Sequence, residues 1–163
     1  MGLLIRGDFK MEENYVSDVR NVADFFLSKC EMTQKKLQKM CYYAYSWYLT
    51  LYDENLFNNG KFEAWVHGPV NPELYQKYKH FGWRNIPKSN VPELCTDLKE
   101  FLDMIFDTFN SYDADELESM THQEQPWIEA RKGCQPDEPS HVVISDNTIK
   151  NFYRNLMEEK QGE

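Results

Sequence analysis

The sequence lacks the glycine-rich and nucleophile-bearing motifs that mark many enzymes. Only seven glycines occur among 163 residues, and neither a phosphate-binding P-loop nor a Gly-x-Ser-x-Gly turn is present. The nearest approach to a thiol–imidazole pair is Cys41 with His67, but helical spacing places Cys41 on an apolar helix face. We therefore expect a protein that is not an enzyme.

Ligand patterns for metals and disulfides are missing as well. The cysteines are widely separated and include no Cys-x-x-Cys pair; they are Cys30, Cys41, Cys95 and Cys134. The histidines do not have the spacing of metal ligands; they are His67, His80, His122 and His141. We expect buried free thiols, no metal and no cofactor.

Membrane-spanning and targeting segments are also lacking. No apolar run approaches the ~20 residues that cross a bilayer. The apolar run at the start of the chain is too short for a secretory signal peptide. Arg6 stands where the myristoylation pattern requires Ser or Thr. We expect a cytoplasmic protein without a membrane partner.

Basic charge is scarce, which argues against a nucleic-acid binder. The net charge is −9, and acidic residues are in excess only after residue 90. A DNA or RNA binder needs a basic surface that replaces the counterions of the phosphates. We expect no nucleic acid partner. An acidic half suits a basic protein partner, or simply keeps the protein in solution.

Aromatic residues, by contrast, are abundant. Ten Tyr, ten Phe and four Trp make up 15% of a chain that is about one domain long. Apolar residues recur at helical spacing, which predicts a mainly α, compact single-domain bundle of about six helices with a small β-hairpin. The helical segments expected are 21–30, 34–52, 72–81, 93–109, 114–121, 127–132 and 146–158.

Capping residues support these boundaries. Thr33, Asn71 and Asp113 precede helical segments at N-cap positions, and Ser145 or Asp146 precedes the last helix. The chain is then divided into an unassigned N-terminal arm (1–20), one domain (21–158) and a C-terminal tail (159–163).

The segment 34–52 is predicted to be the central helix. An apolar seam recurs along it at steps of three and four residues, formed by Leu37, Cys41, Ala44, Tyr48 and Leu51. Tyr42 and Tyr45 point away from that seam, because successive residues are ~100° apart around a helix. We expect these two tyrosines to be exposed.

The stretch 56–75 predicts a hairpin followed by a helix. Asn59-Gly60 is a hairpin turn signal between residues 56–57 and the alternating residues 62–67. Gly68-Pro69 is interpreted as a turn at the end of this hairpin, which leads into the next helix.

Three lysines lie near a predicted helix N-terminus, where the helix dipole disfavours positive charge. Lys35, Lys36 and Lys39 lie in the first turns of the segment 34–52, where cations face the positive end of the helix dipole. Either they form a solvated face that the acidic helix 93–109 neutralises, or they form a basic contact point for another protein.

Four blocks of sequence point to a family. They are KKLQKMCYYAYSWYLTLYDENLF, FEAWVHGPVNPELYQKYK, LESMTHQEQPW and SDNTIKNFY. In spacing, order and chemistry they resemble the Panacea antitoxin domain, the SocA-like, phage-associated antitoxin family, over residues 21–153. The motif positions, which we expect to be scaffold, are Trp65, His67, Gly68, Pro69, Val70, Pro72, Thr121, His122, Pro126 and Trp127.

The resemblance implies a mostly helical antitoxin that neutralises a cognate toxin, encoded beside it, by direct protein–protein contact. Relatives occur in phages and other mobile elements, and one of them delivers its toxin to a protease. The alternative is therefore a protease adaptor or a phage counter-defence protein. A hydrolase that uses His67, His122 or Cys41 is a more distant alternative. The oligomeric state stays open, and a homo-oligomer is allowed.

The predicted toxin-binding surface combines cations with aromatic rings, as interfaces commonly do. It lies on the central helix and on the helix that Asn71 caps, at Lys35, Lys36, Lys39, Tyr42, Tyr45, Tyr75, Lys79 and His80. The competing surface is the acidic face of residues 93–118, which would suit a basic toxin.

Overall fold

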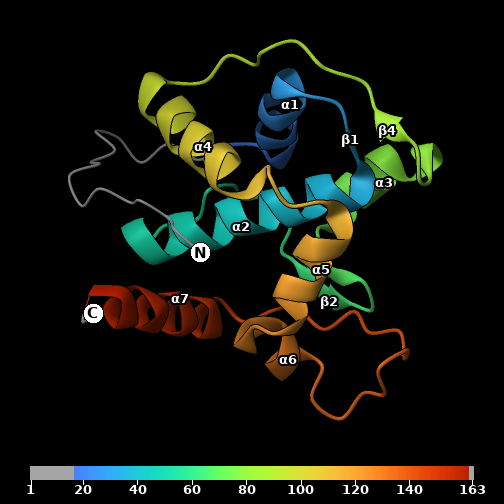
Figure 1. Cartoon of the computed structure of the whole chain (residues 1–163), viewed down its shortest axis with the longest axis vertical. Helices are drawn as coiled ribbons and strands as arrows, with labels where there is room; N and C mark the ends of the chain where they lie inside the picture. Colours follow the sequence, from blue (N-terminus) through green and yellow to red (C-terminus); the bar gives the residue numbers. More distant parts are fainter. Residues whose placement is uncertain (1–16, 162–163) are drawn as a thin grey trace.

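The molecule is built around helix α2 (Gln34–Tyr52), and the computed structural model describes residues 17–161. In Figure 1, α2 crosses the middle of the molecule. Helices α1 (Val19–Lys29) and α4 (Thr96–Phe109) pack on one side of it, and α7 (Asp146–Gln161) packs on the other.

The remaining helices surround α2 at its N-terminal half. Helix α5 (Ala114–His122) packs across it and is followed by the short α6 (Gln125–Ala130), which also contacts α7. Helix α3 (Pro72–Tyr78) continues into the 3-10 turn η1 (Lys79–Phe81). The described residues thus contain seven α-helices, and the mainly α class is confirmed.

Helix α2 is buried along almost its whole length. Every residue from Leu37 to Thr50 is buried, including the polar side chains of Gln38, Lys39 and Ser46. A helix that is covered on all sides is a core helix rather than an amphipathic surface helix. The prediction that this segment is central is confirmed, but the seam described only part of its buried surface.

Tyr42 and Tyr45 lie in the core, and the prediction that they are exposed is wrong. Each exposes only 1% of its surface. The Tyr45 ring packs against Phe57 and Phe62 at centroid distances of 5.3 and 5.6 Å, and the Tyr42 ring lies 5.4 Å from Phe62. The connection that follows α2 folds back over these rings, whereas the prediction assumed that only the seam was covered.

The predicted caps hold the helix starts. The Asn71 side chain accepts a hydrogen bond from Leu74 N at 3.1 Å, and Thr33 accepts one from Lys36 N at 3.3 Å. Asp113 forms a capping box with Glu116. Of the two residues considered for α7, Ser145 acts as the cap, because its Oγ accepts from Thr148 N at 3.3 Å.

Residues 17–20, which were assigned to the N-terminal arm, belong to the fold. Ser17 N donates to the carbonyl oxygen of Leu56 at 2.8 Å, and Asp18 caps α1 by accepting from Arg20 N at 2.7 Å. The rest of the arm, residues 1–16, lies outside the described residues. Of the predicted tail, residues 159–161 continue α7, and 162–163 lie outside the described residues.

The hairpin forms later in the sequence than predicted. Strand β2 (Glu63–Trp65) pairs antiparallel with β3 (Gly68–Val70), in the register Glu63 with Val70 and Trp65 with Gly68. Residues 142–144 continue the sheet on the other edge of β2, since Ala64 N donates to Val142 O at 2.9 Å. A separate two-stranded pair joins β1 (Met32–Thr33) to β4 (Asn85–Ile86).

The hairpin predicted around Asn59-Gly60 is wrong for a long-range reason. The Asn59 side chain accepts a hydrogen bond from Val19 N at 2.8 Å, so it serves as a tie to α1. Phe57 forms an isolated parallel bridge with Ser17 rather than pairing with residues 62–67. Gly68, with φ of +106°, instead provides the left-handed conformation after the short turn at residues 66–67.

The aromatic core also holds a carboxyl group. Glu124, the N-cap residue of α6, is 7% exposed. Its Oε1 accepts hydrogen bonds from the hydroxyls of Tyr43 at 3.0 Å and Tyr153 at 2.9 Å. Burial raises the pKa of Glu124 to about 7. This single acceptor joins α2, α6 and α7.

Candidate functional site

An open groove lies where the N-terminal half of α2 meets the β2–β3 hairpin and the end of α3. Its volume is about 400 Å³, within the range typical of ligand pockets. We call it the aromatic groove; its lining consists of Thr33, Gln34, Lys35, Gln38, Lys39, Trp65, His67, Val70, Tyr75, Lys79, Gly82 and Trp83. The groove brings together four of the predicted toxin-binding residues: Lys35, Lys39, Tyr75 and Lys79.

Three aromatic side chains form the wall of the groove. Trp65 and Tyr75 pack edge to face with their centroids 4.8 Å apart, and Trp65 Nε1 donates to Glu63 Oε1 at 2.9 Å. Trp83 is different, because 81% of its surface is exposed. Two rings are therefore fixed by contacts within the protein, whereas the third leaves its indole exposed to solvent.

Lys39 lies at the floor of the groove, beneath the hairpin. It is 1% exposed, and its Nζ donates to the carbonyl oxygen of Pro69 at 3.2 Å. Desolvation lowers the pKa of Lys39 to about 7, and the negative charge of Glu118 only partly opposes this effect. A lysine predicted to be a surface contact is thus a buried contact between α2 and β3.

Acidic residues of α5 neutralise the other charges at this end of α2. Lys35 Nζ lies 2.7 Å from Asp115 Oδ1 and 3.1 Å from Glu118 Oε1. The same Glu118 oxygen lies 2.9 Å from His67 Nδ1. Glu118 therefore connects α2, α5 and the hairpin through one carboxylate.

Lys36 and His80 lie outside the lining of the groove. Lys36 Nζ donates to the carbonyl oxygen of Asn110 at 2.8 Å, at the C-cap of α4, where a cation is favoured by the helix dipole. His80 is exposed, and its ring packs against Phe81 at 4.3 Å. The interpretation that acidic side chains of 93–109 neutralise the three lysines is wrong. Lys35 pairs with acids of α5, Lys36 donates to the carbonyl oxygen of Asn110, and Lys39 donates to that of Pro69.

The prediction of site residues missed five residues of the groove: Thr33, Gln34, Gln38, Gly82 and Trp83. Gln38 binds the start of α3 twice: its Nε2 donates to Asn71 O at 3.1 Å, and its Oε1 accepts from Asn71 N at 2.8 Å. A glutamine within an otherwise apolar buried run is a signal that could have revealed this contact. Gln34 and Trp83 follow no periodic pattern that would have placed them here.

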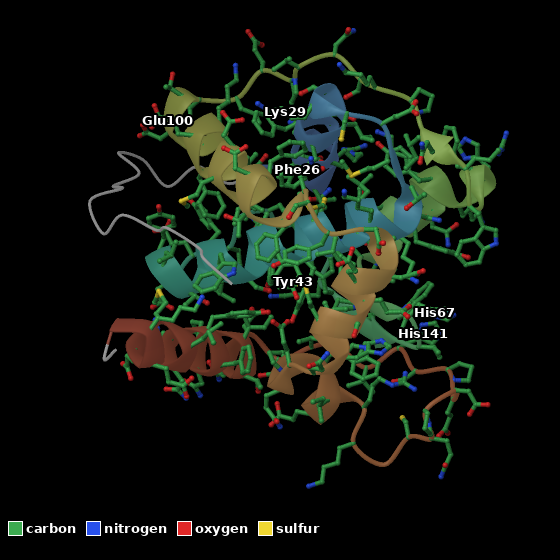
Figure 2. All side chains as sticks on the ribbon, viewed as in Figure 1. Phe26, Lys29, Tyr43, His67, Glu100 and His141 are labelled. Carbon is green, nitrogen blue, oxygen red and sulfur yellow. The ribbon has the colours of Figure 1, made fainter. Side chains whose placement is uncertain are left out.

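The family-motif residues meet at one corner of the molecule. Trp127 Nε1 donates to Trp65 O at 2.9 Å, and the His122 ring stacks on Trp127 at 3.9 Å. Thr121 is buried beside Gly68, while Pro126 and Pro72 occupy the first turns of α6 and α3. Figure 2 shows His67 and His141 together at this corner, and Tyr43 at the centre of the molecule.

The cysteines of the described residues differ in their exposure. Cys41 is fully buried, and burial raises the pKa of its thiol, which opposes the thiolate form that a nucleophile needs. The expectation of buried thiols holds only for Cys41, because Cys95 is exposed and Cys30 and Cys134 are half-buried. Within residues 17–161, no group of three or more His, Cys, Asp or Glu could hold a metal ion, and no helix could cross a membrane.

Comparison with known proteins identifies relatives. A family model described as "Antitoxin SocA-like, Panacea domain" matches residues 37–128, which is more than half of the chain. The chain is also 26% identical over 156 residues to the protein named Antitoxin SocA of Caulobacter vibrioides (strain NA1000 / CB15N), covering 84% of this chain and 82% of that protein. No solved structure is significantly similar to the chain.

The contact between Gly68 and Lys39 predicts a costly substitution. A Cβ added at Gly68 would overlap Lys39 Cε, and φ of +106° adds backbone strain. We expect Gly68→Ala to lower the free energy of unfolding by about 1–3 kcal/mol, measured by urea denaturation. The matched control is Gly133→Ala, where φ is +90° but no atom lies within 4 Å of the added Cβ. Equal losses in both variants would show that the overlap with Lys39 contributes nothing.

The buried lysine predicts a pH-dependent stability. The folded-state pKa of Lys39 is lowered to about 7 from 10.5, so above pH 7 the unfolded state binds more protons and stability rises with pH. We expect the free energy of unfolding to increase between about pH 7 and pH 8.5, by at most about 1.4 kcal/mol per pH unit. Lys39→Met should reduce this slope. The same slope in both proteins would contradict a neutral Lys39 in the fold.

Proposed function

The chain belongs to the SocA-like Panacea antitoxin family, and from that premise we propose that it neutralises a toxin protein by binding it directly across the aromatic groove. In this role it acts in the cytoplasm and performs no catalysis. The toxin is the product of a neighbouring gene.

The exposure of Trp83 carries the proposal. An indole that is 81% exposed leaves a large apolar surface in water, and Trp and Tyr are the residues most enriched among interface hot spots. Trp83 lines the same groove as the rings of Trp65 and Tyr75. A partner that covers this wall removes all three ring surfaces from water at once.

The groove is also well ordered before a partner arrives. The hairpin is tied to α2 through Lys39, to α5 through His67 and to α6 through the Trp127 indole. Gln38 fixes the start of α3 with two hydrogen bonds. Binding therefore orders few additional groups, which favours affinity.

A double substitution tests the groove as the binding site. Trp83→Ser with Lys79→Glu changes two exposed groove residues without touching the buried Lys39. We expect the double variant to bind the product of the neighbouring gene at least ~30-fold more weakly, about 2 kcal/mol. It should also fail to rescue growth when that gene is co-expressed. Calorimetry measures the affinity, and circular dichroism checks the fold.

Two controls match this variant. Ile128→Ser with Lys132→Glu removes one exposed apolar group and reverses one exposed lysine outside the groove. Glu100→Lys with Asp107→Lys reverses the competing acidic face on α4, and Figure 2 shows Glu100 on the opposite edge of the molecule from His67.

The outcomes separate the proposals. Full binding by the groove variant and loss of binding by the α4 variant would place the toxin on the acidic face. If no neighbouring gene product is neutralised, the antitoxin role itself fails. A toxin that disappears faster when the wild-type protein is present would indicate delivery to a protease rather than blocking.

A further inference from the structure

We propose that the aromatic groove selects an acidic segment of the toxin: a carboxylate binds at the lysines of the groove, and a neighbouring apolar side chain packs on its aromatic wall. This inference rests on the proposed function and deepens it, because it names the chemistry of the partner surface.

The side chains that line the groove include basic but no acidic residues, although the protein is strongly negative. The net charge is −9, yet the lining contains three lysines and a histidine and neither Asp nor Glu. Acids of α5 pair with Lys35 and His67. For Lys39 and Lys79, no carboxylate in the described part of the chain lies within ion-pair distance. Lys79 is a cation, and Lys39 is a buried amine that an incoming carboxylate would charge, so both complement an acidic partner.

The floor of the groove offers both a donor and an acceptor. Lys39 Nζ has at least two N–H groups, and within residues 17–161 it makes one hydrogen bond, to Pro69 O. Gln34 also lines the groove, and its Oε1 is buried and has no hydrogen-bond partner among the described residues. A carboxylate accepts from Lys39, and a backbone N–H donates to Gln34 Oε1. An extended acidic peptide supplies both groups, whereas a small anion supplies only the first.

The shape of the groove also favours a peptide. The groove is open along the wall formed by Trp65, Tyr75 and the exposed Trp83, so a segment of chain can lie across it. Lys79 is exposed at its rim, while Lys39 is buried at its floor. The Lys79 cation at the rim steers an acidic segment towards the groove, and the buried Lys39 amine gains a proton when a carboxylate binds beside it.

Proton uptake marks a contact with Lys39. An incoming carboxylate favours the charged form of a lysine whose pKa is lowered to about 7 by burial. The other titratable groups that face Lys39 are Lys35 on α2, Glu118 and His122 on α5, and His67 on the hairpin. At about pH 8, binding of an acidic segment should therefore take up protons, and Lys39→Met should remove most of this uptake.

The first test is independent of the toxin. The full chain is titrated with the acetylated hexapeptide amide Glu-Asp-Phe-Glu-Asp-Leu and with its neutral counterpart Gln-Asn-Phe-Gln-Asn-Leu, and NMR follows the indole N–H resonances. The dissociation constants are obtained from the shifts of the Trp83 and Trp65 resonances. We expect the acidic peptide to bind at least tenfold more tightly than the neutral peptide. Lys79→Met should abolish that preference, and Lys132→Met should not. Equal binding of the two peptides, or no shift with either, would overturn the inference.

The second test uses the complex with the neighbouring gene product. Calorimetry at about pH 8 in two buffers of different ionisation enthalpy measures the proton uptake, with wild type and Lys39→Met compared. Each Asp and Glu of the toxin is also replaced by Asn or Gln. We expect substitutions at one or two adjacent acidic positions of the toxin to weaken binding more than tenfold. We expect proton uptake with the wild-type protein and not with Lys39→Met.

The two failures are distinguishable. If the toxin is neutralised but no acidic position matters, the inference is overturned and the proposed function stands. If no neighbouring product is neutralised, the proposed function fails, and the peptide titration still decides the chemistry of the groove. A free protein that dimerises, and that Trp83→Ser converts to a monomer, would assign the groove to a second copy and overturn the inference.

Discussion

The burial of α2 on all sides is the constraint on which the rest of the structure depends. Several of its polar side chains are buried and form hydrogen bonds with other elements. Gln38 binds Asn71 at the start of α3, Lys39 binds Pro69 O in β3, and the Tyr43 hydroxyl donates to Glu124 at the start of α6. Each contact satisfies a buried polar group and also fixes the position of one surrounding element.

The contact between Lys39 and the hairpin links this core to the surface. Gly68 leaves the space that the Lys39 side chain occupies, and its positive φ turns β3 back against β2. The hairpin then places Trp65 against Tyr75 at the edge of the groove. The contact between buried Lys39 and the hairpin thus determines where the aromatic wall of the groove lies. Five residues of the family motif, from Trp65 to Val70, belong to this hairpin.

The helices and their caps could be predicted from neighbouring residues. The predictions for Asn59 and Tyr45 were wrong, because contacts between distant parts of the sequence determine their positions. A cap such as Thr33 acts on residues three positions away, so its signal lies in the adjacent sequence. Asn59 looked like a hairpin turn, but it binds α1, 40 residues earlier. Tyr45 is covered by a segment whose path no periodicity specifies. In the candidate site, Lys35 and Tyr75 were predicted, but Trp83 was not, because exposure of an aromatic ring leaves no pattern in a sequence.

The central claim is that the aromatic groove is the surface that meets the toxin. Hydrogen exchange of backbone amides, compared between the free protein and its complex with the product of the neighbouring gene, tests this claim most directly. The account predicts slower exchange in the complex for the first turns of α2, for the hairpin and for residues 75–83. Protection confined to α4 and the acidic residues of α5, with the hairpin unchanged, would contradict it.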